Sequence, residues 1–447
     1  MRVLLVAVAA FAAGLAVFLS RGEDTPARPV ARPVLTGTSA DIPGLQRAVR
    51  GGRADLRPAL AEAYLQRARE TADPSFYAKA ESVLGEPRTP EAFATAGELA
   101  LARHAFARAL ELGARAGAIG APIRVDALVE LGRIDEAERE LQAMIDRRPN
   151  LAGYARVSYL RELRGDLAGA VEAMRLAVAA GGPAAENGAY VSTLLGELER
   201  RRGRTGAARQ AFGRALALVP GHAGAELGLA RLDAETAARA GRASGASGAA
   251  DASGAAGASG AADASGTAGA APASGPGGAE AASERGIARL ERLVARLPLP
   301  EYVIALGEAE LAAGRDARDR FALVAAEQKL LAGAGVDTDV ELAVFEADHG
   351  DPRTAVELAR RGYAAAPSLR AADALGWALT RAGDPEAGLR YAREALRLGS
   401  VDPLWRAHAG LAAIAAGRDG SKDLKLALEH GLDGWPWQAQ RVRRGLQ

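Results

Sequence analysis

The stretch that decides the fold runs from Tyr190 to Pro220 and reads YVSTLLGELERRRGRTGAARQAFGRALALVP. Its two Ala- and Leu-rich runs are separated by Gly203, which can adopt the left-handed conformation that ends a helix. A small residue such as Gly196 lets paired helices approach closely, and Phe212 can fill the space between neighbouring units. Pro220 discourages continuation of the second helix. The stretch therefore predicts a helix hairpin.

Glycines of the same kind recur along the chain, each followed by Arg or Asp. Where neighbouring pairs are uninterrupted, the intervals are 33, 38, 36, 33 and 34 residues. A fixed period of this size is the signature of a helical solenoid. The glycines are Gly132, Gly165, Gly203, Gly314, Gly350, Gly383 and Gly417.

The order of small, large and turn-forming residues resembles the tetratricopeptide repeat family, in particular its bacterial envelope members. The resemblance implies an all-α fold, a right-handed superhelical solenoid of about nine or ten helix hairpins. No cofactor belongs to such an array. The positions that carry the resemblance are Gly132, Ala137, Gly165, Ala170, Leu195, Gly196, Gly203, Ala208, Phe212, Ala215, Pro220, Leu306, Gly307, Gly350, Ala355, Leu375, Gly376, Gly383, Gly388 and Ala395.

Arrays of this family hold peptides or protein segments in a concave groove lined by the first helix of each hairpin. By this resemblance, the candidate groove contacts lie on or near the first helices in the middle of the chain. The alternative for each residue is a position on a solvated outer face. The candidates are Arg161, Asn187, Glu197, Arg200 and Arg201.

An Ala/Gly/Ser tract at residues 241–283 interrupts the period. Gly203 and Gly314 are 111 residues apart, whereas two 34-residue units need 68, which leaves a surplus of 43. The tract repeats GAADASG at Gly248–Gly254 and Gly260–Gly266 and has almost no large side chains. We therefore expect a disordered insert in the turn of one repeat. It is either a repeat expansion in a tolerant surface loop or a tether or recognition segment.

The N-terminus predicts placement outside the cytoplasm. Residues Val3 to Leu19 are seventeen consecutive uncharged, mainly apolar residues. As a helix they would span about 26 Å, the lower limit for crossing a bilayer core. The run is an uncleaved anchor in the cytoplasmic membrane, a cleaved export signal of a periplasmic or secreted protein, or a buried helix. A spacer rich in proline follows it.

These observations divide the chain into six segments. The predicted boundaries are 1–22 for the signal peptide or anchor, 23–44 for the Pro-rich spacer, 45–240 for the first part of the array, 241–283 for the insert, 284–434 for the second part of the array, and 435–447 for a C-terminal cap or tail.

Composition and motifs exclude several classes of function. Fifty-six Lys and Arg against fifty-five Asp and Glu give no global bias towards nucleic acid or anionic lipid. The absence of cysteine excludes disulfides, cysteine nucleophiles and thiolate metal sites. The sequence contains no H-E-x-x-H, G-x-S-x-G, P-loop or dinucleotide-binding motif. We therefore predict that the protein is not an enzyme and has neither a catalytic nor a metal site.

Two local features have competing interpretations. The charged turn at Glu346–Asp351, which contains His349, is interpreted as a capped turn in preference to a metal site. Trp435 and Trp437 flank Pro436 after the last unit. They either cover the exposed end of the solenoid or dock a partner, and contact with a membrane or nucleic acid is a further alternative.

The resulting function hypothesis is a scaffold or adaptor that binds a protein or peptide partner through its concave face, outside the cytoplasmic membrane. The alternative is an accessory subunit of envelope biogenesis or export, acting in the assembly of polysaccharide or outer-membrane proteins. The membrane is contacted through the N-terminal segment, and no nucleic acid partner is expected.

Overall fold

The computed structural model describes residues 41–71, 73–181, 185–253 and 276–447. These residues form twenty-two α-helices and no strand, which confirms the predicted all-α right-handed solenoid. The predicted leader at 1–22 and nearly all of the spacer at 23–44 lie outside the described residues. None of the described helices is long and apolar enough to span a bilayer.

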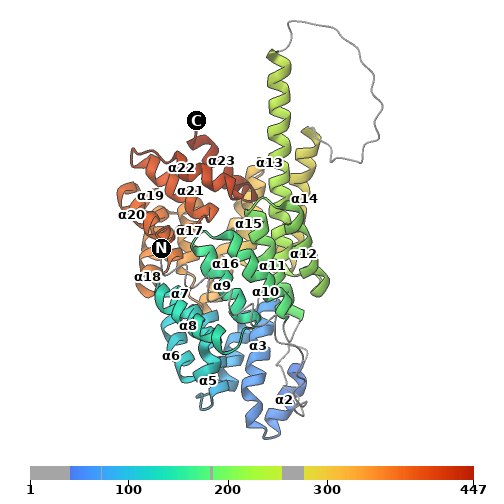
Figure 1. Cartoon of the computed structure of the whole chain (residues 1–447), viewed down its shortest axis with the longest axis vertical. Coiled ribbons are helices and arrows are strands. Elements are labelled where there is room, and N and C mark those ends of the chain that lie inside the picture. The colour runs from blue at the N-terminus through green and yellow to red at the C-terminus, as the bar shows by residue number, and fades with distance from the viewer. Residues whose placement is uncertain (1–40, 72, 182–184, 254–275) are drawn as a thin grey trace. The chain divides into compact units, whose positions relative to one another are not determined.

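Ten helix hairpins follow one another in chain order (Figure 1), and the two helices of each hairpin pack against each other. A single helix, α2 (Ile42–Arg50), precedes them. The first five hairpins are α3 (Arg57–Thr71) with α4 (Ser75–Leu84), α5 (Pro90–Ala102) with α6 (Phe106–Arg115), α7 (Ala121–Glu130) with α8 (Ile134–Arg147), α9 (Leu151–Leu163) with α10 (Leu167–Ala180), and α11 (Ala185–Arg201) with α12 (Thr205–Leu218).

The second five hairpins are α13 (Ala223–Ser253) with α14 (Pro276–Arg296), α15 (Pro300–Ala312) with α16 (Arg318–Gly333), α17 (Asp339–His349) with α18 (Pro352–Ala365), α19 (Leu369–Arg381) with α20 (Pro385–Ala395), and α21 (Pro403–Ala415) with α22 (Ser421–Glu429). The short 3-10 helix η4 (Leu432–Gly434) and helix α23 (Pro436–Gly445) close the chain. Two further 3-10 turns, η2 and η3, lie at Ala54–Leu56 and Gly117–Gly120.

The predicted packing of the Tyr190–Pro220 hairpin is confirmed. Phe212 of α12 is fully buried, and its ring fills the space between Gly196 of α11 and Gly228 of α13. A Cβ atom at either glycine would overlap with that ring. Gly203 ends α11 with a φ of 70°, the left-handed conformation that the sequence predicts. Of the seven recurrent glycines, only Gly350 departs from this pattern, with a φ of −124°.

The interrupted repeat is completed across the insert. Helix α13 packs on α14, and Leu227 and Leu290 belong to the same apolar cluster. Helix α13 continues to Ser253 and α14 begins at Pro276, so both helices extend into the segment predicted as disordered. The remainder of that segment, residues 254–275, lies outside the described residues.

Hairpins far apart in sequence also meet, at offsets of five or six hairpins. The end of α5 meets the loop before α17, where Asp337 donates its backbone N–H to the Arg103 carbonyl at 3.1 Å. After α7, the Gly132 carbonyl accepts a bond of 3.2 Å from Arg397. After α11, Arg201 pairs with Asp402 at 3.3 Å, where the tenth hairpin begins. Residues next to the eighth, ninth and tenth hairpins therefore contact the second, third and fifth hairpins.

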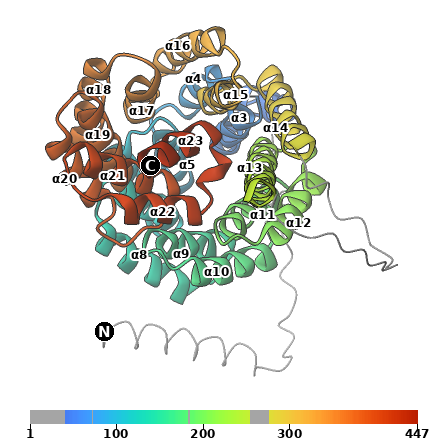
Figure 2. The ribbon, with the colours of Figure 1, turned by 90° about the horizontal axis from the view of Figure 1, so that it is seen from above.

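The C-terminal segment, residues 430–446, lies against first helices of the later hairpins. Helix α23 contacts α13, α15 and α21, and η4 contacts α13 (Figure 2). Leu432, Ala439 and Val442 are buried in an apolar cluster with residues of α21 and α22. The segment thus covers part of the inner surface formed by the first helices.

Candidate functional site

First helices α3 to α11 share an inner surface of charged side chains. Arg156 of α9 donates to Asp126 of α7 at 2.8 Å. Arg69 of α3 reaches Glu186 of α11 at 3.4 Å, a contact across 117 residues of sequence. These pairs bring four of the five first helices onto one continuous surface, which we call the inner face.

Glu98 of α5 is the most perturbed carboxyl of the inner face. Its side chain is exposed, but the surrounding helices displace much of the water around it. This partial burial, together with the negative charge of Glu62, raises the pKa of Glu98 to about 7 against an ordinary value of 4.5. Arg69 and Arg156 oppose the shift. Glu98 therefore lies where an added positive charge would be stabilised.

Tyr190 of α11 adds an aromatic side chain to the inner face. It is 54% exposed, although burial of its hydroxyl among the first helices raises its pKa. Glu62, Glu98, Asp126 and Glu186 face two arginines, Arg69 and Arg156, on this surface. With all six groups ionised, the inner face has an excess of two negative charges.

Above the inner face, a pocket of about 240 Å³ lies between α5 and α7 on one side and α17 to α19 on the other. Arg370 of α19 lies 3.7 Å from Glu341 of α17 and also interacts with Glu130 of α7 and Tyr159 of α9. Burial of the hydroxyl, with Glu130 beside it, raises the pKa of Tyr159. The pocket is thus a junction between hairpins that are six apart.

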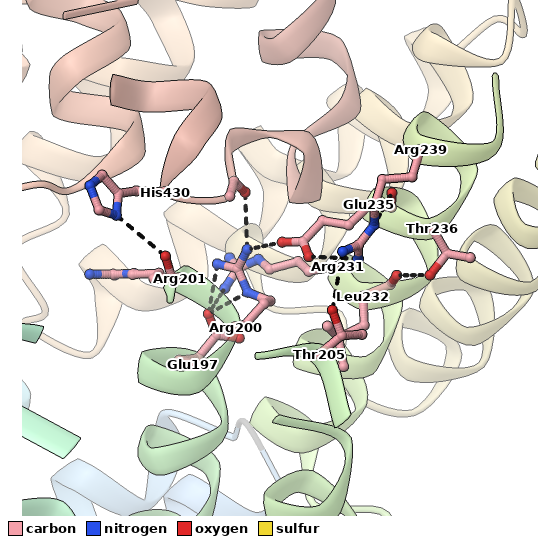
Figure 3. Close-up of polar contacts among 11 residues, drawn as sticks. Glu197, Arg200, Arg201, Thr205, Arg231, Leu232, Glu235, Thr236, Arg239 and His430 are labelled. Carbon is pink, nitrogen blue, oxygen red and sulfur yellow. Dashed lines mark hydrogen bonds and ion pairs between the residues drawn. The ribbon is translucent and has the colours of Figure 1, made fainter. Parts of the chain in front are cut away.

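The predicted groove contact Arg200 lies in a buried ion-pair network (Figure 3). Its guanidinium donates to Glu197 at 2.9 Å and to Glu235 of α13 at 2.5 Å. It also donates to the backbone carbonyl of Gly431 at 3.0 Å, across 231 residues of sequence. Arg200 therefore holds α11, α13 and the C-terminal segment together.

The predicted contact Glu197 is the shared acceptor of that network, since Arg231 of α13 also lies 3.6 Å from it. Burial acts to raise the pKa of Glu197, but the cations of Arg200, Arg231 and Arg201 outweigh it and lower the pKa to about 2. Glu197 is therefore ionised throughout the physiological range. Its removal would leave buried cations without their partner.

The other three predicted contacts have different surroundings. Arg201 pairs with Glu162 of α9 at 2.5 Å as well as with Asp402. Burial acts to lower the pKa of Arg201, but these two carboxylates raise it. Arg161 donates to the Gly169 carbonyl at 2.9 Å, within its own hairpin, and Asn187 is half-buried in the first turn of α11. The five predicted contacts therefore do not form one open cluster.

The charged turn at Glu346–Asp351 divides into two parts. The carboxylate of Glu346 accepts the Asp351 backbone N–H at 2.9 Å, and Asp351 caps α18. Asp348 and His349 instead point towards Glu308 of α15, with their ligand atoms within 4.8 Å of one another. Among the described residues this is the group whose composition and spacing could hold a metal ion.

The polar atoms of this group are already engaged by the chain itself. His349 Nε2 lies 3.1 Å from Glu308, and Gln438 of α23 donates to both Glu308 and Asp348, at 3.2 and 2.8 Å. Arg441 of α23 donates to Asp348 at 2.5 Å. Burial acts to raise the pKa of Asp348, but the Arg441 cation outweighs it. The group therefore fastens α23 to α15 and α17.

Sequence reasoning missed Glu98, Glu308, Gln438 and the buried pair of Asp373 with His408, whose side chains lie 2.9 Å apart. The sequence could have indicated Glu308. It follows Leu306-Gly307 at the repeat position where Glu197, a candidate contact, follows Leu195-Gly196. Both glutamates lie on first helices and interact with another element: Glu197 with Arg231 of α13, and Glu308 with Gln438 of α23. The two tryptophans of the C-terminal segment pack against side chains of first helices, Trp435 against Arg231 of α13 and Trp437 against His349 of α17.

No protein-family profile matches the chain, and no curated protein matches it. Among solved structures, a human IFIT1 dimer with m7Gppp-AAAA is similar at 14% identity, covering 91% of this chain and 86% of that one, with a TM-score of 0.46. The APC/C hetero-tetramer Cut9-Hcn1 has 12% identity, coverages of 92% and 88% and a TM-score of 0.30. A tetratricopeptide repeat protein from Parabacteroides merdae ATCC 43184 has 10% identity, coverages of 72% and 98% and a TM-score of 0.33. The function is therefore argued from the residues of this chain.

Proposed function

We propose that the protein is a non-enzymatic scaffold that holds a protein or peptide partner against its inner face. The strongest support is that the early first helices carry exposed side chains, whereas later first helices are covered by the C-terminal segment. The inner face of α3 to α11 presents exposed Glu98 and Tyr190, whereas the C-terminal segment packs on α13, α15 and α21. An exposed aromatic residue among carboxylates is the kind of surface that holds a partner by both packing and charge.

The partner that fits this surface best has a positively charged segment. The excess of carboxylates on the inner face would steer such a segment during association. The raised pKa of Glu98 also supports a positively charged partner, since a cation of the partner beside Glu98 would relieve the repulsion from Glu62.

We further propose that the array works outside the cytoplasmic membrane. The support is the apolar run of Val3–Leu19, followed by the proline-rich spacer. Protease added to spheroplasts is expected to digest the array. Full protection in intact spheroplasts, with digestion after lysis, would contradict this placement.

Site-specific photocrosslinking tests the scaffold proposal. A photoreactive amino acid replaces Tyr190 on the inner face or, as a matched control, Leu330, which is 58% exposed on α16, the second helix of its hairpin. We expect a partner to crosslink at position 190 and not at position 330. Adding Glu98→Lys should weaken the crosslink at position 190, because it reverses the charge next to the partner. Equal crosslinking at both positions would contradict binding on the inner face.

A further inference from the structure

A second recess lies between α19, α21 and α23. Its volume is about 460 Å³. Three arginines line it: Arg381 from α19 and Arg441 and Arg444 from α23. We call it the arginine pocket.

The arginine pocket carries more positive charge than the described residues around it neutralise. Arg441 is paired with Asp348 at 2.5 Å. Arg381 and Arg444 each donate through Nε to a backbone carbonyl, of Ala347 and Gln440 respectively. Neither of them forms an ion pair within the described part of the chain. Three cations against one carboxylate leave an excess of two positive charges, and the Nη groups of Arg381 and Arg444 donate to no acceptor among the described residues.

The tryptophans of the pocket serve to position Arg441. Its guanidinium lies 5.0 Å from the ring centroid of Trp377 and 4.6 Å from that of Trp437. Trp377 also stacks on His408 at 4.5 Å, and Trp437 lies 4.6 Å from the His349 ring. Because both rings already contact partners of their own, they favour a fixed arginine over a stacked aromatic ligand.

We propose that the arginine pocket binds the dianionic phosphate group of a small soluble molecule. A phosphate carries about −1.5 to −2 charges at neutral pH and three acceptor oxygens, which matches the unneutralised charge of the pocket. Guanidinium groups form paired, charge-assisted hydrogen bonds with phosphate oxygens. Arg441 is held in place before binding, so little of its side-chain entropy remains to be lost. Leu411 and Ala415 of α21 form the apolar wall beside the phosphate.

Calorimetric titration of the full-length protein tests the proposal with three probes at constant ionic strength: inorganic phosphate, glycerol phosphate and acetate. We expect saturable binding of the two phosphates and much weaker binding of acetate, which has one charge and two oxygens. Equal affinity for the two phosphates would identify free phosphate as the ligand. Tighter binding of glycerol phosphate would place an organic carrier against Leu411 and Ala415.

Three variants locate the binding. Arg381→Gln and Arg444→Gln should each weaken phosphate binding about tenfold or more, because each removes a charge-assisted hydrogen bond. The matched control is Arg393→Gln, which changes an exposed arginine of α20 outside the pocket and should leave the affinity unchanged. Circular dichroism verifies that all three variants are folded.

Four results would overturn the proposal. In the titrations they are the absence of saturable phosphate binding, or an affinity for acetate equal to that for phosphate. In the other measurements they are an unchanged phosphate affinity in the folded double variant of Arg381 and Arg444, or binding to anionic phospholipid vesicles without binding to either soluble phosphate. The last result would assign the pocket to a membrane surface. None of these results bears on the inner face, so the scaffold proposal is tested separately by the crosslink at position 190.

Discussion

Glu98 is a single residue whose chemistry depends on four helices. Its carboxyl lies within the influence of Glu62 on α3, Asp126 on α7 and Arg156 on α9. Each of these residues is an ordinary charged residue in the sequence, roughly one repeat from the next. The raised pKa arises only when the solenoid brings them together.

Glu98→Gln should change how stability depends on pH. Because the pKa of Glu98 is about 7 in the folded protein and near 4.5 in the unfolded chain, the wild type loses stability as pH rises from 4.5 to 7. Glutamine is neutral throughout and does not contribute this loss. Thermal unfolding of the variant should therefore shift upwards relative to the wild type between pH 5 and pH 8.

Glu172→Gln on α10, an exposed glutamate of a second helix, is the matched control and should produce no such pH-dependent difference. Carbon-13 NMR titration of the Glu98 carboxyl measures its pKa directly. A value near 4.5 would show that the inner face does not displace water around this group.

Some residue-scale features could be predicted from the sequence and others could not. The close approach at Gly196 and the left-handed turn at Gly203 follow from the residues themselves, because glycine is required at both places. The binding partners of Arg200 and Glu308 could not be predicted, since Gly431 and Gln438 are 231 and 130 residues away from them. No local pattern encodes contacts of that separation.

At the scale of the element, each hairpin is held by the fit of large side chains against small ones. Gly196→Ala should destabilise the protein by about 1–3 kcal/mol, because the new methyl group overlaps with the Phe212 ring, which Gly228 confines on its other side. Chemical denaturation followed by circular dichroism gives the free energy of unfolding.

The matched control for this change is Gly206→Ala on α12 of the same hairpin. Gly206 is exposed, and no atom lies within 4 Å of the added methyl group. Alanine has the higher helix propensity, so this variant should be about as stable as the wild type or up to roughly 1 kcal/mol more stable. Equal destabilisation by the two variants would show that helix propensity, and not packing against Phe212, determines the result.

Helix boundaries were less predictable than helix existence. The period predicted about nine or ten hairpins, and its recurrent glycines lie in the turns of seven of the ten described hairpins. The limits of the insert were harder to predict, since alanine has the highest helix propensity and glycine one of the lowest, and the tract alternates between them. The structure extends α13 to Ser253 and begins α14 at Pro276.

At the scale of the whole molecule, the two halves of the solenoid are joined twice, by the α13–α14 hairpin and by the contacts between hairpins five or six apart. A protease site placed within residues 254–275 should therefore be cleaved without separating the halves. Asp233 of α13 with Arg289 of α14, and Arg201 with Asp402, remain on opposite fragments and still in contact. Size-exclusion chromatography should show one peak that contains both fragments.

The same cleaved sample in denaturant should give two peaks, which verifies that the cut is complete. Two separate peaks under native conditions would mean that the contacts across the solenoid are too weak to hold it closed. These contacts between distant hairpins could not be predicted from the sequence, because they result from small rotations added over five or six successive hairpins.

The contacts between hairpins five or six apart have a consequence for how this gene can change. In an open array, duplicating or losing one unit lengthens or shortens the protein and leaves the remaining units as they were. Here, one extra unit between α12 and α19 would bring Gly132 opposite the wrong loop, and Arg201 would no longer reach Asp402. Unequal recombination within this region would therefore be selected against, and copy number should vary only outside it.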